Sequence, residues 1–213
     1  MNETKTWQIS WTVIVAFLVG AQFIIAYVVG AGQLLKNINA SFFAPIAVTA
    51  VVPVTVFIAI YLMSKRFREM VWSIDIMLLT MMQAWRVIGF VFLPLYAVGL
   101  LPGLFSWPAG LGDVAIGLIA VVMVIRLKRN PDYIFGSGFV WFNVMGLLDF
   151  AVAVITAGLA AGALPEMITD GITSAPMDVW PLNIFPSFFV PVFIIMHACV
   201  LLKISHLKKQ KIE

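Results

Sequence analysis

The chain has 213 residues, of which 62% are hydrophobic and 11% charged, with a mean hydropathy of +1.05 and a net charge of +3. A soluble domain carries about a quarter charged residues, so this composition excludes a water-exposed globular surface, and the small net charge gives no sign of nucleic-acid binding. The single cysteine, Cys199, and two histidines exclude a disulfide and argue against a metal centre. We expect one transmembrane domain covering residues 1–213.

Six stretches are long and apolar enough to cross a hydrocarbon core of about 30 Å, which needs about 20 helical residues. The first has a longer apolar run than a secretory signal and no clear cleavage site, so we interpret it as a retained helix. We therefore predict an all-α polytopic membrane protein with six transmembrane helices, over residues 10–30, 42–63, 72–93, 108–127, 137–159 and 184–204.

The loops between these stretches differ in charge. Ten of the thirteen Lys and Arg residues lie in the segments 64–71 and 126–134 and in the tail from residue 203. The opposite connections hold only Lys36, and the 160–183 loop is acidic. Because cytoplasmic loops are rich in Lys and Arg, this alternation predicts both termini in the cytoplasm.

Polar residues interrupt the spans, although an Arg or Asp at mid-helix costs about 3 kcal/mol to insert. Helical spacing places Gln83 and Arg86 on one stripe, and Asp113 and Asp149 among small residues, so the charges are expected to face protein rather than lipid. The interrupting residues are Gln22, Asp75, Gln83, Arg86, Asp113, Asn143, Asp149 and His197.

Depth predicts which of these side chains meet. At 1.5 Å per residue, Arg86 and Asp149 lie about 13 Å below the outer boundary, Asp113 about 8 Å and His197 about 20 Å, whereas Asp75 lies near the inner boundary. We predict a cluster of Arg86, Asp113 and Asp149 above His197. Two ionised aspartates against one arginine leave an excess negative charge, which either holds a proton or awaits a cation or a donor-rich ligand.

The neighbours of this cluster leave several readings open. Gln83 and Asn143 are candidate ligand-binding residues, although an isolated amide in a membrane helix usually joins helices by hydrogen bonds. His197 fits a hydrogen-bonded interior residue, a proton relay or a single axial haem ligand, and the sequence identifies no cofactor.

Residues 110–113 read GLGD and resemble the motif of presenilin-type proteases and prepilin peptidases. Those enzymes pair this aspartate with one on an earlier helix, which here is only Asp75. The predicted depths separate Asp75 and Asp113 by well over 10 Å, whereas a proton-sharing pair needs about 3 Å. The PAL sequence of the presenilin type is also absent from the last helix, so we do not favour a protease.

Three segments indicate a cavity on the outer side. Pro186 and Pro191 predict a broken last helix, a feature that often lines a binding site in membranes. The 160–183 loop is long and is expected to act as a lid or interfacial helix. The uncharged connection over residues 94–107 is expected to be re-entrant or to lie along the interface.

Four segments, QAWRVIGFVF, LPGLFSWPAGLGD, WFNVMGLLDF and PSFFVPVFIIMHACVL, resemble a group of bacterial membrane proteins without a known activity. The resemblance covers residues 83–202 and implies a prokaryotic cell membrane, but no activity, substrate or cofactor.

The sequence favours a binding or transport protein with an outward-facing intramembrane polar pocket for a small molecule, ion or lipid-like ligand. The predicted site residues are Arg86, Asp113, Asp149, His197, Gln83 and Asn143. Two alternatives stay open: a structural or assembly subunit, and an intramembrane enzyme acting on a lipid-like substrate, for which no nucleophile is evident. The expected partners are the lipid bilayer and such a ligand, with a homo-oligomer or a partner membrane subunit left open.

Overall fold

The computed structural model describes residues 2–163 and 171–211, with the side chains of residues 11–162 and 171–211. The described residues form helices and turns and contain no strand. Among them are six helices long and apolar enough to cross a membrane, as the sequence predicts. They run over Trp11–Ala31, Pro45–Met63, Ile76–Ala97, Gly103–Arg129, Ser137–Gly162 and Phe185–Gln210.

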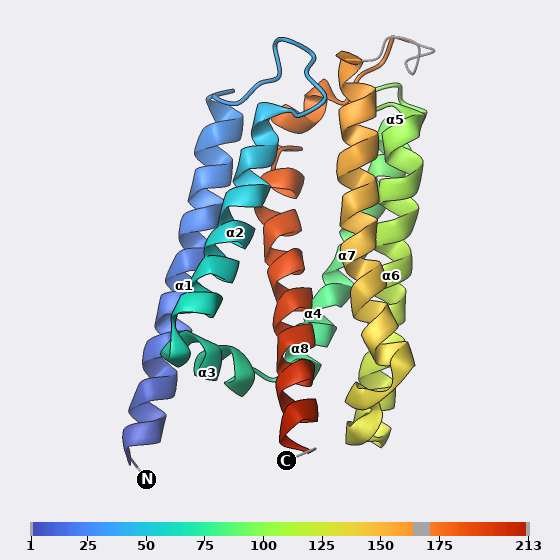
Figure 1. Cartoon of the computed structure of the whole chain (residues 1–213). Coiled ribbons are helices and arrows are strands. Elements are labelled where there is room, and N and C mark those ends of the chain that lie inside the picture. Colours follow the sequence, from blue (N-terminus) through green and yellow to red (C-terminus); the bar gives the residue numbers. More distant parts are fainter. Residues whose placement is uncertain (1, 164–170, 212–213) are drawn as a thin grey trace.

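These six stretches form a bundle in which α8 lies between α1 and α2 on one side and the α6–α7 pair on the other (Figure 1). Helix α8 contacts both α2 and α7, and α1 packs on η7, the first turn of the last span. The elements are α1 (Asn2–Ala31), η1 (Pro45–Ala47), α2 (Val48–Met63), α3 (Lys65–Ser73), α4 (Ile76–Met82), η2 (Gln83–Val91), α5 (Phe92–Ala97), α6 (Gly103–Arg129), η3 (Pro131–Phe135), α7 (Ser137–Gly158), η4 (Leu159–Ala163), η6 (Ala175–Asp178), η7 (Phe185–Phe189) and α8 (Val190–Gln210).

Helix α1 begins and α8 ends at the same end of the bundle, where α3 and the connection between α6 and α7 also lie (Figure 1). The sequence predicts a loop over residues 64–71, but Ser64 is the N-cap of α3 and residues 65–71 belong to this helix. Ser64 caps α3 by accepting a hydrogen bond from the Phe67 N–H at 3.3 Å. Arg68 donates to the carbonyls of Tyr61 and Leu62 at 3.3 and 2.9 Å, which satisfies the last turn of α2.

The third span is not one α-helix but α4, η2 and α5 in succession, with η2 a 3₁₀-helix of nine residues. A 3₁₀-helix has three residues per turn, so Gln83, Arg86 and Gly89 lie in one line, and all three are buried. Helix η2 packs closely on α6, and a Cβ on Gly117 of α6 would overlap Val87 of η2. The glycine therefore allows the two helices to approach closely.

The connection that follows is much shorter than expected. Helix α5 ends at Ala97 and α6 begins at Gly103, so the turn contains only residues 98–102. Gly99 has a φ of +71°, a conformation that favours glycine, and it reverses the chain. Leu101 is fully buried in the turn. The expected re-entrant segment over residues 94–107 is therefore wrong, because most of these residues extend the two flanking helices.

Two buried apolar clusters lie at opposite ends of the bundle. The terminal cluster, at the end that holds the chain termini, joins α4, α6, α7 and α8 through Ile76, Ile116, Ala120, Met123, Leu127, Phe139, Phe142, Val200 and Ile204. The distal cluster joins the other ends of α5, α6 and η4 through Phe92, Leu101, Phe105, Ala109, Ala160 and Met177. The buried charges lie between the two clusters.

Candidate functional site

Arg86 is the centre of the site. Its side chain is 0% exposed, and its Nε donates a hydrogen bond to Asp113 Oδ1 at 2.8 Å, while Nη2 pairs with Asp149 Oδ2. Its Nη1 donates to the carbonyl of Gly146 at 3.1 Å, and its guanidinium carbon lies 3.9 Å from the centre of the Phe150 ring. The planar guanidinium thus joins η2 to α6 and α7, a geometry that a point-like ammonium cannot reproduce.

His197 lies behind the arginine, on α8. Its Nε2 is 3.4 Å from Arg86 Nη1, and its Nδ1 is 3.0 Å from Asn143 Oδ1. Because Asn143 uses its Nδ2 to donate to the Phe139 carbonyl at 2.9 Å, its oxygen accepts and His197 Nδ1 carries the proton. A Cβ on Gly146 would overlap the imidazole. Both ring nitrogens are engaged, which leaves neither for haem ligation.

Unlike Arg86, the carboxylates of Asp113 and Asp149 reach a cavity. Their side chains are 16% and 13% exposed for Asp113 and Asp149, and both line the cavity described below. The backbone of Gly89 lies against Asp113 and that of Gly112 against Asp149, so a Cβ at either glycine would collide with a carboxylate. Within the described part of the chain, Asp113 Oδ2 and Asp149 Oδ1 have no hydrogen-bond partner.

The remaining polar residues of the spans lie apart from the carboxylates. Gln83 donates to the Phe193 carbonyl at 3.3 Å, one 3₁₀ turn before Arg86, and does not line the cavity. Gln22 donates to the carbonyls of Thr49 and Ser187 at 3.2 and 2.5 Å, and so joins α1 to α2 and η7. Gln22 therefore has the helix-joining geometry expected of an isolated amide.

Asp75 lies at the start of the third span, eleven residues before Arg86, and has a local role. It is the exposed N-cap residue of α4, and its Oδ1 accepts from the N–H groups of Met77 and Leu78 at 2.7 and 3.4 Å. Because Arg86 lies between Asp113 and Asp149 and binds both, these two aspartates do not form the proton-sharing pair of a protease dyad. No group of three or more His, Cys, Asp or Glu residues within the described ranges could hold a metal ion.

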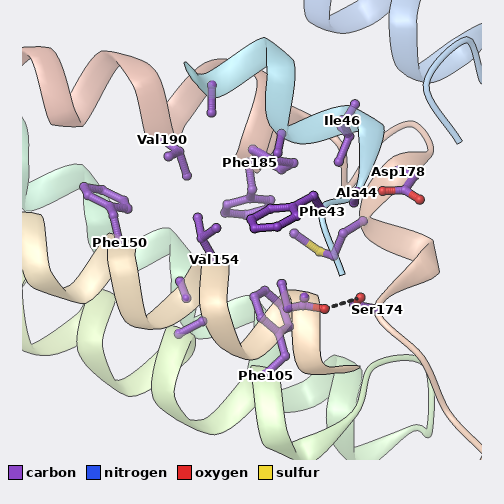
Figure 2. Close-up of a pocket in the computed structure, with 18 of the residues that line it drawn as sticks. Phe43, Ala44, Ile46, Phe105, Phe150, Val154, Ser174, Asp178, Phe185 and Val190 are labelled. Atoms are coloured by element: carbon purple, nitrogen blue, oxygen red, sulfur yellow. Dashed lines mark hydrogen bonds between the residues drawn. The ribbon is translucent and has the colours of Figure 1, made fainter. Parts of the chain in front are cut away.

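A cavity of about 150 Å³ opens beside the carboxylates, between η1, α2, α6, α7 and η7 (Figure 2). Phe43, Phe105 and Phe185 project into it from three different segments. Asp113 and Asp149 lie at one end of the lining and Ser174 and Asp178 at the other, and every other lining residue is apolar or glycine. The cavity is therefore less polar than the sequence suggests, with charge confined to its two ends.

The end away from Arg86 is formed by two chain segments that meet. Asp178 Oδ2 accepts from the Asn37 N–H at 2.9 Å, and Ser174 Oγ donates to the Ala157 carbonyl at 2.8 Å. Burial raises the pKa of the Asp178 carboxyl, and the Asn37 N–H and Lys36 only partly offset this effect. Ser174, Met177 and Asp178 thus line this end of the cavity. Residues 164–170, which include Glu166 and Asp170, lie outside the described residues.

The last span begins with a π-helix, η7, which contains Pro186. Helix α8 follows directly and begins one residue before Pro191. π-Turns are rare and often occur at functional sites. Pro186 and Phe185 line the cavity, and the Ser187 carbonyl accepts from Gln22. The sequence predicts this break. It does not predict that the Arg86 guanidinium lies over the Phe150 ring, although Phe150 directly follows Asp149.

The profile of a domain of unknown function, DUF8737, matches residues 42–205. This range contains the whole candidate site, the second to fifth spans and most of the last span. Comparisons with curated proteins and with solved structures gave no significant match. Because the match covers most of the chain, this protein belongs to the DUF8737 family.

Proposed function

We propose that this protein is a binding or transport protein of the prokaryotic cell membrane, and that its cavity takes a small apolar or lipid-like molecule. The observation that carries this proposal is the cavity itself, which is lined by apolar side chains and has two carboxylates at its inner end. Ligand sites are typically concave and apolar with a few polar groups that orient the ligand.

The proposal includes an orientation. The three segments rich in Lys and Arg lie at the end of the bundle where α1 begins and α8 ends (Figure 1). Cytoplasmic loops carry such an excess, so we place this end in the cytoplasm. The Asp178 end of the cavity then faces the outer side, and a ligand enters from there or from the outer leaflet.

The cytoplasmic half of the bundle supports a binding pocket rather than an open channel. The terminal cluster fills the space beneath His197 with tightly buried side chains, including Phe139 and Phe142. A continuous water path is absent from such a core, because protein interiors pack at the density of organic crystals. Transport through this site would therefore require a rearrangement of the terminal cluster.

One observation favours the alternative of a structural subunit. The single side chain of Arg86 forms hydrogen bonds that link η2 to both α6 and α7. That role explains the arginine but not the cavity. An enzyme has less support: Ser174, the hydroxyl residue in the described lining, donates its proton to the Ala157 carbonyl and not to a side-chain base.

The test compares two substitutions of the same kind on α7. Ala153 lines the cavity one turn from Asp149, whereas Ala151 is exposed on the same helix and does not line it. We expect native mass spectrometry of gently purified protein to find a bound small molecule in the wild type and in Ala151→Phe, but not in Ala153→Phe. The same bound species in all three proteins would contradict the proposal.

A further inference from the structure

The charges of the cavity define its ligand more narrowly. We propose that the ligand is a small amphipathic amine with a single positive charge, and that its ammonium group lies against Asp113 and Asp149 while its apolar part fills the cavity. This inference rests on the proposed function and concerns the same site. It identifies a chemical class where the cavity alone indicates only an apolar molecule.

The titratable residues of the lining are all acidic. The lining contains Asp113, Asp149 and Asp178, and no Lys, Arg or His residue. The nearest cation, Arg86, lies behind the carboxylates with a side chain that is 0% exposed, so it cannot contact a ligand in the cavity. When both carboxylates are ionised, one arginine against two of them leaves one uncompensated negative charge at the inner end. An anionic ligand would meet only repulsion there.

The hydrogen-bonding capacity of the site matches an ammonium group. Arg86 occupies Asp113 Oδ1 and Asp149 Oδ2, while Asp113 Oδ2 and Asp149 Oδ1 remain without partners among the described residues. An ammonium has three donors and no acceptor, so it can donate to carboxylate oxygens that have no other partner. A zwitterionic lipid headgroup would bring a phosphate into the same acidic lining, which favours a ligand whose only charge is the ammonium.

Size limits the apolar part. An apolar cavity of about 150 Å³ in another protein binds benzene, and this cavity has a similar volume. The apolar part is therefore about one ring or a chain of about six carbons.

The experiment uses three probes with one chain and three charges: hexylamine, 1-hexanol and hexanoate. Binding is measured at pH 7 by calorimetry on the full chain in discs of uncharged lipid, with empty discs as the blank. An alkylamine is protonated at this pH. We expect hexylamine to bind wild type about 10- to 100-fold tighter than hexanol, the range for hydrogen bonds to charged groups, and hexanoate to bind weakest.

Asp149→Asn tests the charge, because it leaves Arg86 and Asp113 as a neutral pair and removes the excess. We expect the preference for hexylamine over hexanol to fall to about threefold or less, since the charge-assisted hydrogen bond is lost. Asp132→Asn is the matched control, because Asp132 is an exposed acid at the opposite end of the protein, and it should keep the full preference. Asp113→Asn serves as the second test variant if Asp149→Asn does not fold.

The outcomes separate this inference from the proposed function. Equal binding of all three probes that is lost in Ala153→Phe would overturn the amine while leaving the pocket intact. An amine preference that survives both Asp149→Asn and Ala153→Phe would place the binding elsewhere and overturn both proposals. Absence of hexylamine binding at millimolar concentration would also overturn the amine.

Discussion

Removal of the Arg86 charge is the most direct test of what holds the bundle together. In Arg86→Met, the carboxylates of Asp113 and Asp149 keep their buried positions but lose their common partner, and the face of Phe150 loses its cation. Removal of one partner from a buried ion pair typically costs about 3–5 kcal/mol. At about 2–4 °C per kcal/mol for a chain of this size, the midpoint of thermal unfolding should fall by roughly 6–20 °C.

The assay is thermal unfolding in one detergent, followed by tryptophan fluorescence, with a rescue variant beside the single one. The triple variant Arg86→Met, Asp113→Asn, Asp149→Asn removes every charge of the cluster. Replacement of a buried ion network by neutral groups is often neutral or stabilising, so we expect the triple variant to recover most of the lost stability.

Either of two results would refute this reasoning. A triple variant as unstable as Arg86→Met would show that the arginine acts through its packing volume and not through its charge. An Arg86→Met protein within about 1 kcal/mol of wild type would show that the carboxylates are solvated through the cavity and need no partner.

Two further predictions concern the surroundings of the cluster. Gly146→Ala should lower the free energy of unfolding by about 1–3 kcal/mol because its Cβ would overlap His197. Gly20→Ala, with no atom within 4 Å of the new Cβ, should be neutral or stabilising. Thermal unfolding of both variants measures the difference, and equal shifts of the unfolding midpoint would contradict the packing argument. Burial raises the pKa of Asp178. The stability linked to its protonation is therefore fully present below the ordinary carboxyl pKa and is lost as pH rises through the raised value. Asp178→Asn should flatten this part of the stability–pH profile, and an unchanged slope would refute the prediction.

The spans and the charged cluster are predictable from the sequence because both depend on one-dimensional quantities. Apolar length against bilayer thickness gives the six helices, and a rise of 1.5 Å per residue brings Arg86, Asp113 and Asp149 to similar depths. Arg86 does pair with both carboxylates, with His197 at its side.

Other features depend on tertiary contacts that no sequence window contains. The 3₁₀ winding of η2 is one, because a mostly apolar nine-residue segment does not by itself select 3₁₀ over α winding, and the choice follows the contact with α6. The short turn at Gly99 is another, since an apolar run gives no sign of where a helix ends inside it. The apolar character of the cavity is a third, because its walls come from segments more than 100 residues apart, such as Phe43 and Phe185.

The 3₁₀ winding has a mechanical consequence for the ion pairs. Residues 83, 86 and 89 are in line only at 120° per residue; at the 100° of an α-helix, Gly89 would turn by about 120° relative to Gln83, and η2 would shorten by about 4 Å. Gly89 would then leave the Asp113 side chain, and Arg86 would rotate away from Asp149. The carboxylates therefore fix the rotation of the third span through Arg86, and we expect a substitution that frees the arginine to let η2 rotate relative to α6.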